Sequence, residues 1–316
     1  MNTPATPPGF WRVILTALRP RTLPLSLATV LAATLTAALQ GRFHIGVFAL
    51  LLSTTLLLQI FCNLANDYGD GMRGTDRDRS DAPVRVLAAQ WITPAAMRRV
   101  LWVSGSLCAL SGLWLLHTAL PHLSGLAAHW WPWLAAGTAA LAAAWFYTGG
   151  RRPYGYAGWG DVAVWLFFGW VGVLGGALLF GAQADLPAAA AANAVGLWCA
   201  AVLNINNLRD RENDAANGKH TLAVRLGARG GLIYHVLLLL LAAASWAVWL
   251  AHALPAWLWP LTAVALTVFY RRHAASIARA QQPAGRTEYN RQLASLSRFV
   301  LLWVMGHGAA MIAISI

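Results

Sequence analysis

Nine long apolar stretches constrain what this chain can fold into. Each is close to the roughly 20 mostly apolar residues with which a helix crosses a bilayer. They occupy residues 22–40, 43–65, 97–118, 128–147, 161–181, 187–205, 231–250, 254–271 and 297–315. Only 11% of the 316 residues are charged, whereas soluble domains carry about 25%. Because the strict alternation of membrane-spanning strands is also missing, the sequence predicts an all-α membrane protein with one transmembrane domain over residues 1–316.

The basic residues are sorted to one side of these stretches. With a cytoplasmic N-terminus, the N-terminal segment and the loops after every second stretch contain all 23 Lys and Arg residues except Arg42. Loops rich in Lys and Arg stay cytoplasmic, so the pattern predicts nine spans, with the N-terminus inside and the C-terminus outside. This topology accounts for the net charge of +12, and we expect no nucleic-acid partner. Arg12, Arg19 and Arg21 interrupt the N-terminal segment, so we expect no cleavable signal there.

Most of the 11 acidic residues lie in two clusters on the predicted cytoplasmic side. The first cluster comprises Asp67, Asp70, Asp76, Asp78 and Asp81, and the second comprises Asp210, Glu212 and Asp214. If the preceding helices continue through these clusters, spacings of three and four residues stack side chains on one face. In the first cluster the pairs at these spacings are Asn63 with Asp67, Asn66 with Asp70, and Asp67 with Asp70; in the second cluster Asn206, Asp210 and Asp214 share a face.

Carboxylate and amide oxygens in this pattern suit magnesium. Mg²⁺ in proteins usually takes one or two carboxylates together with substrate phosphate oxygens and water. Nearby basic residues could bind the same phosphate oxygens; they are Arg73, Arg209, Arg211 and Lys219. Since no glycine-rich nucleotide loop occurs in a suitable context, a diphosphate other than a nucleotide is favoured. The alternative is that these acids only cap or solvate helix ends.

At these motifs the chain resembles the UbiA-type intramembrane prenyltransferases. N-D-Y-G-D after the second stretch and D-R-E-N-D after the sixth match the two acidic motifs of that family. Within the family, the chain is most similar to the branch that uses 1,4-dihydroxy-2-naphthoate as the prenyl acceptor in menaquinone synthesis. The segments that carry this closer resemblance are Arg19–Pro24, Asn63–Gly71, Tyr147–Asp161 and Asn206–Gly227. Many family members have a further Asp where this chain has Gly74, and the naphthoate branch tends to have Gly there.

The resemblance implies a bundle of nine helices with a cytoplasmic cap formed by segments of about 66–96, 148–160 and 207–230. It also implies a Mg²⁺-dependent enzyme that transfers a polyprenyl group from polyprenyl diphosphate to the naphthoate, with loss of CO₂ and diphosphate. We expect catalytic roles for Asp67, Asp70, Asp210, Asp214 and Tyr147. The implied metal ligands are Asn66, Asp67 and Asp70 for one ion, and Asp210 and Asp214 with Asn206 for the other. The basic residues expected to bind diphosphate are Arg73, Arg209, Arg211 and Lys219.

Four further residues are candidates for the acceptor side of the site. Tyr154, like Tyr147, is a candidate by resemblance for facing an allylic cation. Arg19 or Arg21 could bind the acceptor carboxylate, although both could equally be charges that only set topology. Asp161 could help to activate the acceptor, but we give a helix-capping role the preference.

Two other functions remain open at this stage. One is prenyl transfer by a UbiA-type enzyme to a different ring such as 4-hydroxybenzoate. The other is an ion-coupled transporter, which would carry its polar groups near the middle of the membrane rather than at one face. We expect a multi-pass protein of the bacterial cytoplasmic membrane, with the bilayer as a partner and the oligomeric state left open.

Overall fold

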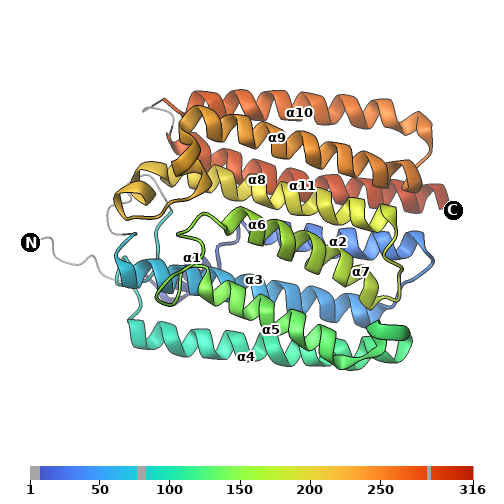
Figure 1. Ribbon diagram of the computed structural model, residues 1–316, viewed down its shortest axis with the longest axis horizontal. Coiled ribbons are helices and arrows are strands. Elements are labelled where there is room, and N and C mark those ends of the chain that lie inside the picture. The colour runs from blue at the N-terminus through green and yellow to red at the C-terminus, as the bar shows by residue number, and fades with distance from the viewer. Residues whose placement is uncertain (1–7, 77–82, 283–285, 316) are drawn as a thin grey trace, which may run out of the picture.

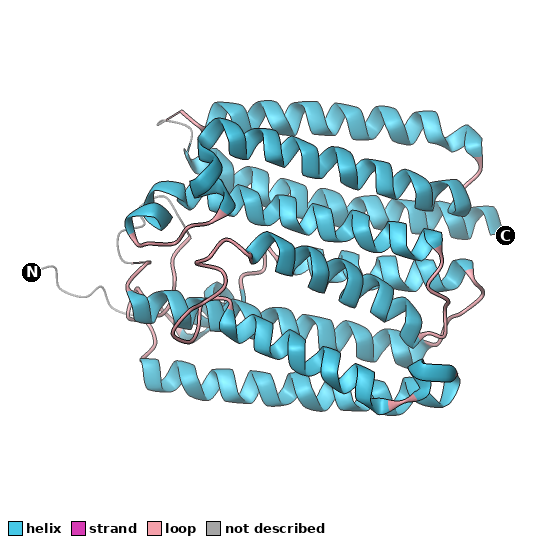
Figure 2. Ribbon diagram, viewed as in Figure 1, coloured by secondary structure: helices cyan, strands magenta, loops and turns pink. Residues whose placement is uncertain are grey.

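A computed structural model describes residues 8–76, 83–282 and 286–315, and every regular element in these residues is helical (Figures 1 and 2). The elements are α1 (Phe10–Leu18), α2 (Leu23–Leu39), α3 (Ile45–Arg73), α4 (Pro94–Ala119), η1 (Leu120–His122), η2 (Gly125–Ala128), α5 (Trp130–Phe146), α6 (Gly160–Val164), the π-helix η3 (Trp165–Gly175), α7 (Gly176–Leu179), α8 (Leu186–Ala216), α9 (Leu222–Ala253), η4 (Ala256–Leu258), α10 (Trp259–Ala280) and α11 (Arg286–Ser315). The long helices run side by side, and the connections lie at the two ends of the bundle (Figure 1).

Each of the nine apolar stretches coincides with a helix or, for 161–181, with the consecutive segments α6, η3 and α7. Six helical segments in the described residues are long and apolar enough to span a membrane by themselves, and α1 with α2, bent by 51°, makes a seventh candidate. The six are Ile45–Arg73, Pro94–His122, Gly160–Leu179, Leu186–Ala216, Leu222–Ala253 and Thr287–Ile314. The all-helical, multi-span prediction is therefore confirmed, while α5 is only 17 residues long and the second half of α10 is charged.

Local sequence signals fix where several helices begin. Asp185 Oδ1 accepts a hydrogen bond of 2.9 Å from the backbone N–H of Ala188 at the start of α8. Thr93 and Thr221 cap α4 and α9 in the same way, through their hydroxyl oxygens. These caps satisfy backbone donors that the first helical turn leaves unpaired, so the helix starts follow from single polar residues at the ends of apolar runs.

Two helices continue beyond the apolar stretches and carry the acidic motifs on their last turns. α3 has 29 residues and ends at Arg73, and α8 has 31 residues and ends at Ala216. The two helices therefore do continue through the acidic clusters, as one-face stacking of the acids requires. The predicted cap is wrong in part, because residues 66–73 and 207–216 are helical rather than loop. Asp78 and Asp81 lie outside the described residues.

α8 is the central helix of the bundle. Of its most apolar window, 67% is buried inside the protein, compared with 22–33% for the other five candidate spans. Glycines allow its neighbour η3 to approach closely: a Cβ on Gly169 would lie 2.3 Å from the carbonyl oxygen of Ala192, and one on Gly196 would lie 2.5 Å from that of Trp165. This close packing holds α8, and with it the second acidic motif, in a fixed position.

Candidate active site

The two acidic motifs meet at Lys219. Its Nζ lies 3.4 Å from Asp70 Oδ2 at the end of α3 and 4.0 Å from Asp214 Oδ1 at the end of α8. The two helix ends are also joined by a hydrogen bond of 2.8 Å from Asn213 Nδ2 to the carbonyl oxygen of Thr75. Burial lowers the pKa of Lys219, but the neighbouring carboxylates outweigh burial and raise this pKa above its ordinary value. A buried positive charge therefore faces both motifs at once.

Tyr156 connects the same groups from the segment between α5 and α6. Its hydroxyl donates a hydrogen bond of 2.8 Å to Asp70 Oδ1 and lies 2.7 Å from Thr75 Oγ1. The Lys219 Nζ and the Arg73 guanidinium lie 5.2 Å and 5.3 Å from the centre of its ring. Burial, and next the Asp70 carboxylate, raise the pKa of this phenol. Tyr156 was not among the predicted site residues, although it lies in the segment Tyr147–Asp161, which contains Tyr147 and Tyr154.

The first motif presents two buried oxygens without a protein donor. Asp67 Oδ2 accepts a hydrogen bond of 3.1 Å from the backbone N–H of Val86, which ties the segment after α3 to the motif. In the described residues, Asp67 Oδ1 and Asn66 Oδ1 are buried and have no hydrogen-bond partner. An unpaired buried oxygen is costly unless a ligand completes it. These two oxygens therefore suit a hard cation.

The second motif is held together by Arg209. Its guanidinium bonds both oxygens of Asp210, at 2.8 and 2.7 Å, and donates to Oδ1 of Asn206 at 2.7 Å. A fourth bond, of 2.7 Å, reaches Asn290 on α11, and the arginine side chain is only 4% exposed. Charge-assisted bonds of this kind fix geometry. The structure thus places Arg209 as a clamp on the motif, which differs from the diphosphate-binding role that we expected.

The other predicted diphosphate-binding arginines also have protein partners. Arg73 donates hydrogen bonds to the carbonyl oxygens of Thr148 and Gly150, on the turn after α5. Arg211 is partly exposed and lies 3.8 Å from Glu212. Of the four predicted basic residues, Lys219 is the one that the described structure places between the two motifs.

Tyr147 and Asp161 line the same region. The Tyr147 side chain is close enough to Asp70, Asp161 and Asp214 to interact electrostatically with all three carboxylates. Asp161 is 3% exposed, and its Oδ1 accepts a hydrogen bond of 3.5 Å from the hydroxyl of Tyr234 on α9. Trp159 occupies the N-cap position of α6, and Asp161 lies in the first turn of that helix.

Tyr154 contacts the site only through its ring. The rings of Tyr147 and Tyr154 meet edge to face, with their centroids 5.5 Å apart. The Tyr154 hydroxyl points elsewhere and donates a hydrogen bond of 2.9 Å to the carbonyl oxygen of Ala143 on α5. Its polar atom therefore anchors the segment, while its ring supports that of Tyr147.

The two N-terminal arginines differ in position. Arg19 lies at the break between α1 and α2 with φ of 51°, in the left-handed region that non-glycine residues seldom adopt. Its charge interacts with the Asp67 carboxylate. Arg21 is exposed. The structure therefore brings Arg19 to the site and leaves Arg21 on the surface.

Gly69 explains one further feature of the N-D-Y-G-D motif. A Cβ at this position would lie 2.3 Å from Thr148 Oγ1 and 2.7 Å from the carbonyl oxygen of Thr148. Only glycine therefore lets the turn after α5 rest directly on α3, where Arg73 also holds it. The predicted site residues included the acids of this motif but not its glycine.

The predicted metal ligands do not form a preassembled metal site in the described structure. In the residues that the structure describes, no group of three or more His, Cys, Asp or Glu side chains is arranged to hold a metal ion. Two observations nevertheless fit a cation bound with its substrate. The oxygens of Asn66 and Asp67 are unpaired, and the single amine of Lys219 lies within 4.0 Å of both Asp70 and Asp214. The donor set consists of hard oxygens, as magnesium prefers.

Known proteins share both the sequence and the fold of this chain. The UbiA prenyltransferase family model matches residues 26–296. The chain is 43% identical over 253 residues to 1,4-dihydroxy-2-naphthoate octaprenyltransferase from Escherichia coli (strain K12), covering 79% of this chain and 80% of that protein. It is 39% identical over 287 residues to the Haemophilus influenzae protein of the same name, covering 90% of each.

Solved structures show the same fold at low sequence identity. A UbiA homolog from Archaeoglobus fulgidus bound to GPP and Mg²⁺ superposes with a TM-score of 0.65 at 16% identity, over 95% of this chain and 99% of that chain. The structure of the homolog with DMAPP and Mg²⁺ gives a TM-score of 0.64 at 16% identity, with the same coverage. A UbiA homolog from Aeropyrum pernix K1 gives 0.60 at 20% identity, over 92% and 98% of the two chains.

Proposed function

This chain belongs to the UbiA prenyltransferase family, and from this premise we propose that it transfers a polyprenyl group from polyprenyl diphosphate to 1,4-dihydroxy-2-naphthoate. CO₂ and diphosphate are lost, and demethylmenaquinol, a precursor of menaquinone, is formed. The observation that carries the acceptor assignment is the identity of 39–43% to proteins named for this reaction, over most of the chain. The meeting of both acidic motifs at Lys219 supports a diphosphate-binding centre.

Magnesium is the proposed cofactor. Asn66, Asp67 and Asp70 would hold one ion, and Asp210 and Asp214 with Asn206 would hold another. Bound there with the donor, the metal supplies positive charge that stabilises the departing diphosphate. The unpaired oxygens of Asn66 and Asp67 support this proposal, as do the Mg²⁺ and prenyl diphosphates bound by the Archaeoglobus fulgidus protein of the same fold.

The residues of the chain have separate tasks in the proposed reaction. Lys219 binds diphosphate oxygens and stabilises the charge that develops when the carbon–oxygen bond of the donor breaks. Tyr147 turns its ring towards the allylic cation, since a π face attracts positive charge. Tyr156 holds Asp70 in position, and Arg209 does the same for Asp210. The segments that pack over these groups exclude water, which would otherwise quench the cation.

On the acceptor side, Arg19 binds the carboxylate of the naphthoate. Asp161, oriented by Tyr234, accepts a proton from a ring hydroxyl and so makes the ring a better nucleophile. Arg21 then serves as a charge that sets topology. The proximity of Arg19 to Asp67 and that of Tyr147 to Asp161 support this arrangement.

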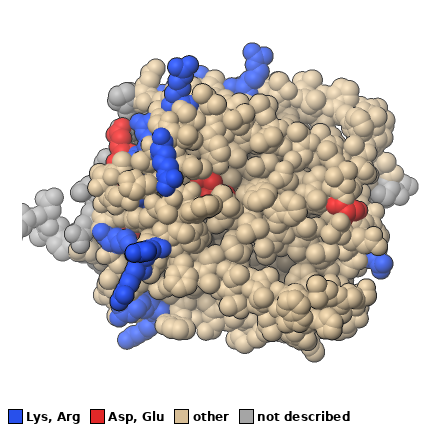
Figure 3. All heavy atoms as spheres, viewed as in Figure 1, with Lys and Arg blue, Asp and Glu red and all other residues tan. Residues whose placement is uncertain are grey.

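We place the enzyme in the bacterial cytoplasmic membrane, with nine crossings and the active site on the cytoplasmic side. Each predicted stretch corresponds to a helix, which supports this topology. Lys and Arg side chains gather towards one end of the visible face (Figure 3). Reporter fusions at the two termini should report opposite sides of the membrane, and a shared side would refute an odd number of crossings.

A direct test offers the purified enzyme one prenyl diphosphate with either 1,4-dihydroxy-2-naphthoate or 4-hydroxybenzoate. Prenylated product should form only from the naphthoate, and product from 4-hydroxybenzoate alone would overturn the acceptor assignment.

Asp67→Asn and Asp210→Asn should each abolish transfer while the protein remains folded in the membrane. Asp185→Asn is the matched control, because this residue caps α8 at the opposite end of the helix from Asp210.

A further inference from the structure

α10 has two distinct faces, and only one of them is covered by protein. The covered face packs Tyr270, His273, Ile277 and Ala280 into the bundle. On the other face, Leu261, Val264 and Val268 are 67%, 61% and 45% exposed. Their spacing of three and four residues places them on one stripe. α10 forms an outer edge of the bundle (Figure 1), so this exposed apolar stripe is suited to contact with lipid acyl chains.

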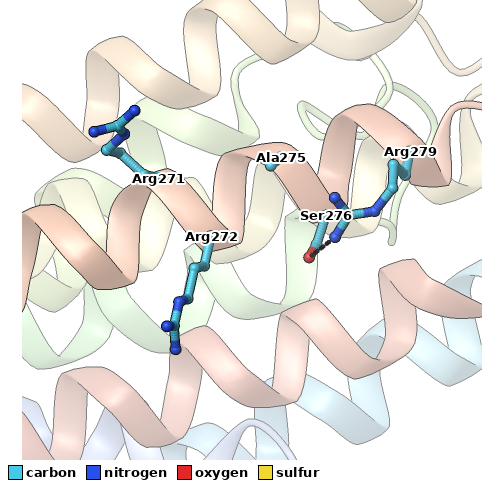
Figure 4. A pocket seen from close by; sticks show the side chains of 5 residues that line it. All are labelled: Arg271, Arg272, Ala275, Ser276 and Arg279. Atoms are coloured by element: carbon cyan, nitrogen blue, oxygen red, sulfur yellow. Dashed lines mark hydrogen bonds between the residues drawn. The ribbon is translucent and has the colours of Figure 1, made fainter.

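The same stripe becomes basic in the last turns of α10. Continuing with the same spacing, it passes from Val268 to Arg271 and Arg272, then to Ala275, and ends at Arg279. An open hollow of about 510 Å³ is lined by Arg271, Arg272, Ala275, Ser276 and Arg279 (Figure 4). The small side chain of Ala275 leaves the space between the arginines open. A helix face typically changes from apolar to cationic where the helix passes from the acyl-chain region of a membrane into its headgroup region.

Within the described residues, the charges of this hollow are not neutralised by carboxylates. In the described residues, no carboxylate lies within ion-pair distance of the guanidinium groups of Arg271, Arg272 or Arg279. Arg279 donates a hydrogen bond of 2.9 Å to Ser276 Oγ, which holds both side chains at the hollow. By contrast, Arg209 on α8 is engaged by carboxylate and amide oxygens of the protein. The α10 arginines therefore retain their capacity to bind an anion.

We propose that the stripe formed by Val264, Val268, Arg272, Ser276 and Arg279 is a binding site for an anionic phospholipid. Arg272 and Arg279 are seven residues apart, about 10 Å along the helix axis, and bind the headgroup phosphate together with the Ser276 hydroxyl. The acyl chains lie along Val264 and Val268. A free anion would contact only the basic part of this stripe. A phospholipid would contact the basic part with its headgroup and the apolar part with its acyl chains. This site lies on α10, apart from the catalytic groups of α3 and α8.

The test is a lipid titration of the full-length protein in detergent, followed by native mass spectrometry. The wild-type protein should retain phosphatidylglycerol in preference to phosphatidylcholine, because only the former carries a net negative charge. Arg272→Gln/Arg279→Gln should bind phosphatidylglycerol about 25-fold more weakly, since each basic residue near an anionic lipid contributes roughly fivefold. The difference should shrink as salt is raised.

The matched control is Arg12→Gln/Arg99→Gln, which removes two exposed charges from other helices, α1 and α4. It should bind phosphatidylglycerol as the wild-type protein does, and both double variants should keep prenyl transfer in detergent. The proposal fails if the α10 variant retains phosphatidylglycerol like the wild-type protein. It also fails if the control loses as much binding, or if the wild-type protein holds both lipids equally.

Discussion

At the scale of single residues, the hydroxyl of Tyr156 is the contact that ties the segment between α5 and α6 to the first acidic motif, through Asp70. Tyr156→Phe removes the hydrogen bond to Asp70 while keeping the ring beneath Lys219 and Arg73. A lost hydrogen bond to a charged group corresponds to about 1.5–3 kcal/mol, so we expect kcat to fall at least about tenfold. Steady-state kinetics with both substrates measures this change.

Tyr154→Phe is the natural comparison for that experiment. The Tyr154 hydroxyl bonds a backbone carbonyl of α5 instead of a carboxylate of the motif. We expect it to lower thermal stability by about 1 kcal/mol and to leave kcat nearly unchanged. Equal losses of kcat in the two variants would contradict the positioning role of Tyr156.

Arg19 and Arg21 form a second informative pair. Arg19→Gln removes the charge placed beside Asp67, and we expect the KM for the naphthoate to rise about tenfold, the loss of one charge-assisted contact. Arg21→Gln alters an exposed side chain and should leave this KM within a factor of two. The KM for the prenyl diphosphate serves as the internal reference. A rise in donor KM alone would reassign Arg19 to the diphosphate.

At the scale of helices and their connections, the approach of the turn after α5 to α3 depends on Gly69. Gly69→Val would push Cβ and two methyl groups into Thr148, whose nearest atom is 2.3 Å from an ideal Cβ. Overpacking of this kind costs about 1–3 kcal/mol and would displace the segment that carries Tyr156. We expect a lower Tm in detergent together with loss of activity.

Gly137→Ala on α5 provides the reference for Gly69→Val. Nothing in the described structure lies within 4 Å of a Cβ at this helical position. The substitution should therefore be neutral or raise stability by up to about 1 kcal/mol. A similar fall in Tm for both variants would mean that glycine replacement in general, rather than contact with Thr148, is responsible.

The sequence predicts the helices better than it predicts the partners of individual side chains. Each predicted apolar stretch coincides with helical residues, and six helical segments of the described residues are long and apolar enough to span a membrane, since lipid demands a run of apolar residues at a crossing. The spacing of the acids was compatible with helices running through the motifs, but the predicted cap treated residues 66–73 and 207–216 as loop, whereas α3 and α8 extend through them. The partners of Arg73 and Arg209 were not predictable. The sequence shows that a basic residue lies near a motif, but it does not show whether that residue binds a backbone carbonyl, a carboxylate or a substrate.

The residues missed at the site share a physical reason. Tyr156 and Gly69 act through contacts between segments about 80 residues apart in the chain, and periodicity reports only neighbours on one helix. Asp161 was assigned a capping role because it precedes an apolar stretch, whereas its partner Tyr234 lies on a distant helix. Local patterns therefore identified the acids, and the tertiary fold supplied the groups that orient them.

At the scale of the whole molecule, activity should depend on a divalent cation that joins the two halves of the site. Chelation with EDTA should abolish transfer, and added Mg²⁺ should restore it. Independently of activity, Mg²⁺ together with diphosphate should raise the Tm, because ligands that bind only the folded state stabilise it by mass action. Asp67→Asn should lose this thermal shift. An unchanged Tm in the wild-type protein would contradict the proposed metal sites.

The position of Lys219 also has a practical consequence, because it is the only lysine in the sequence. Apart from an N-terminal amine, an amine-selective reagent has a single target in this protein, and that target lies between Asp70 and Asp214. Because this amine is buried and its pKa is raised, its acylation requires a higher pH than that of an ordinary lysine, and it then reports on the catalytic centre without any engineered label. Occupancy by donor, product or inhibitor can then be followed as protection of one peptide in a mass spectrum.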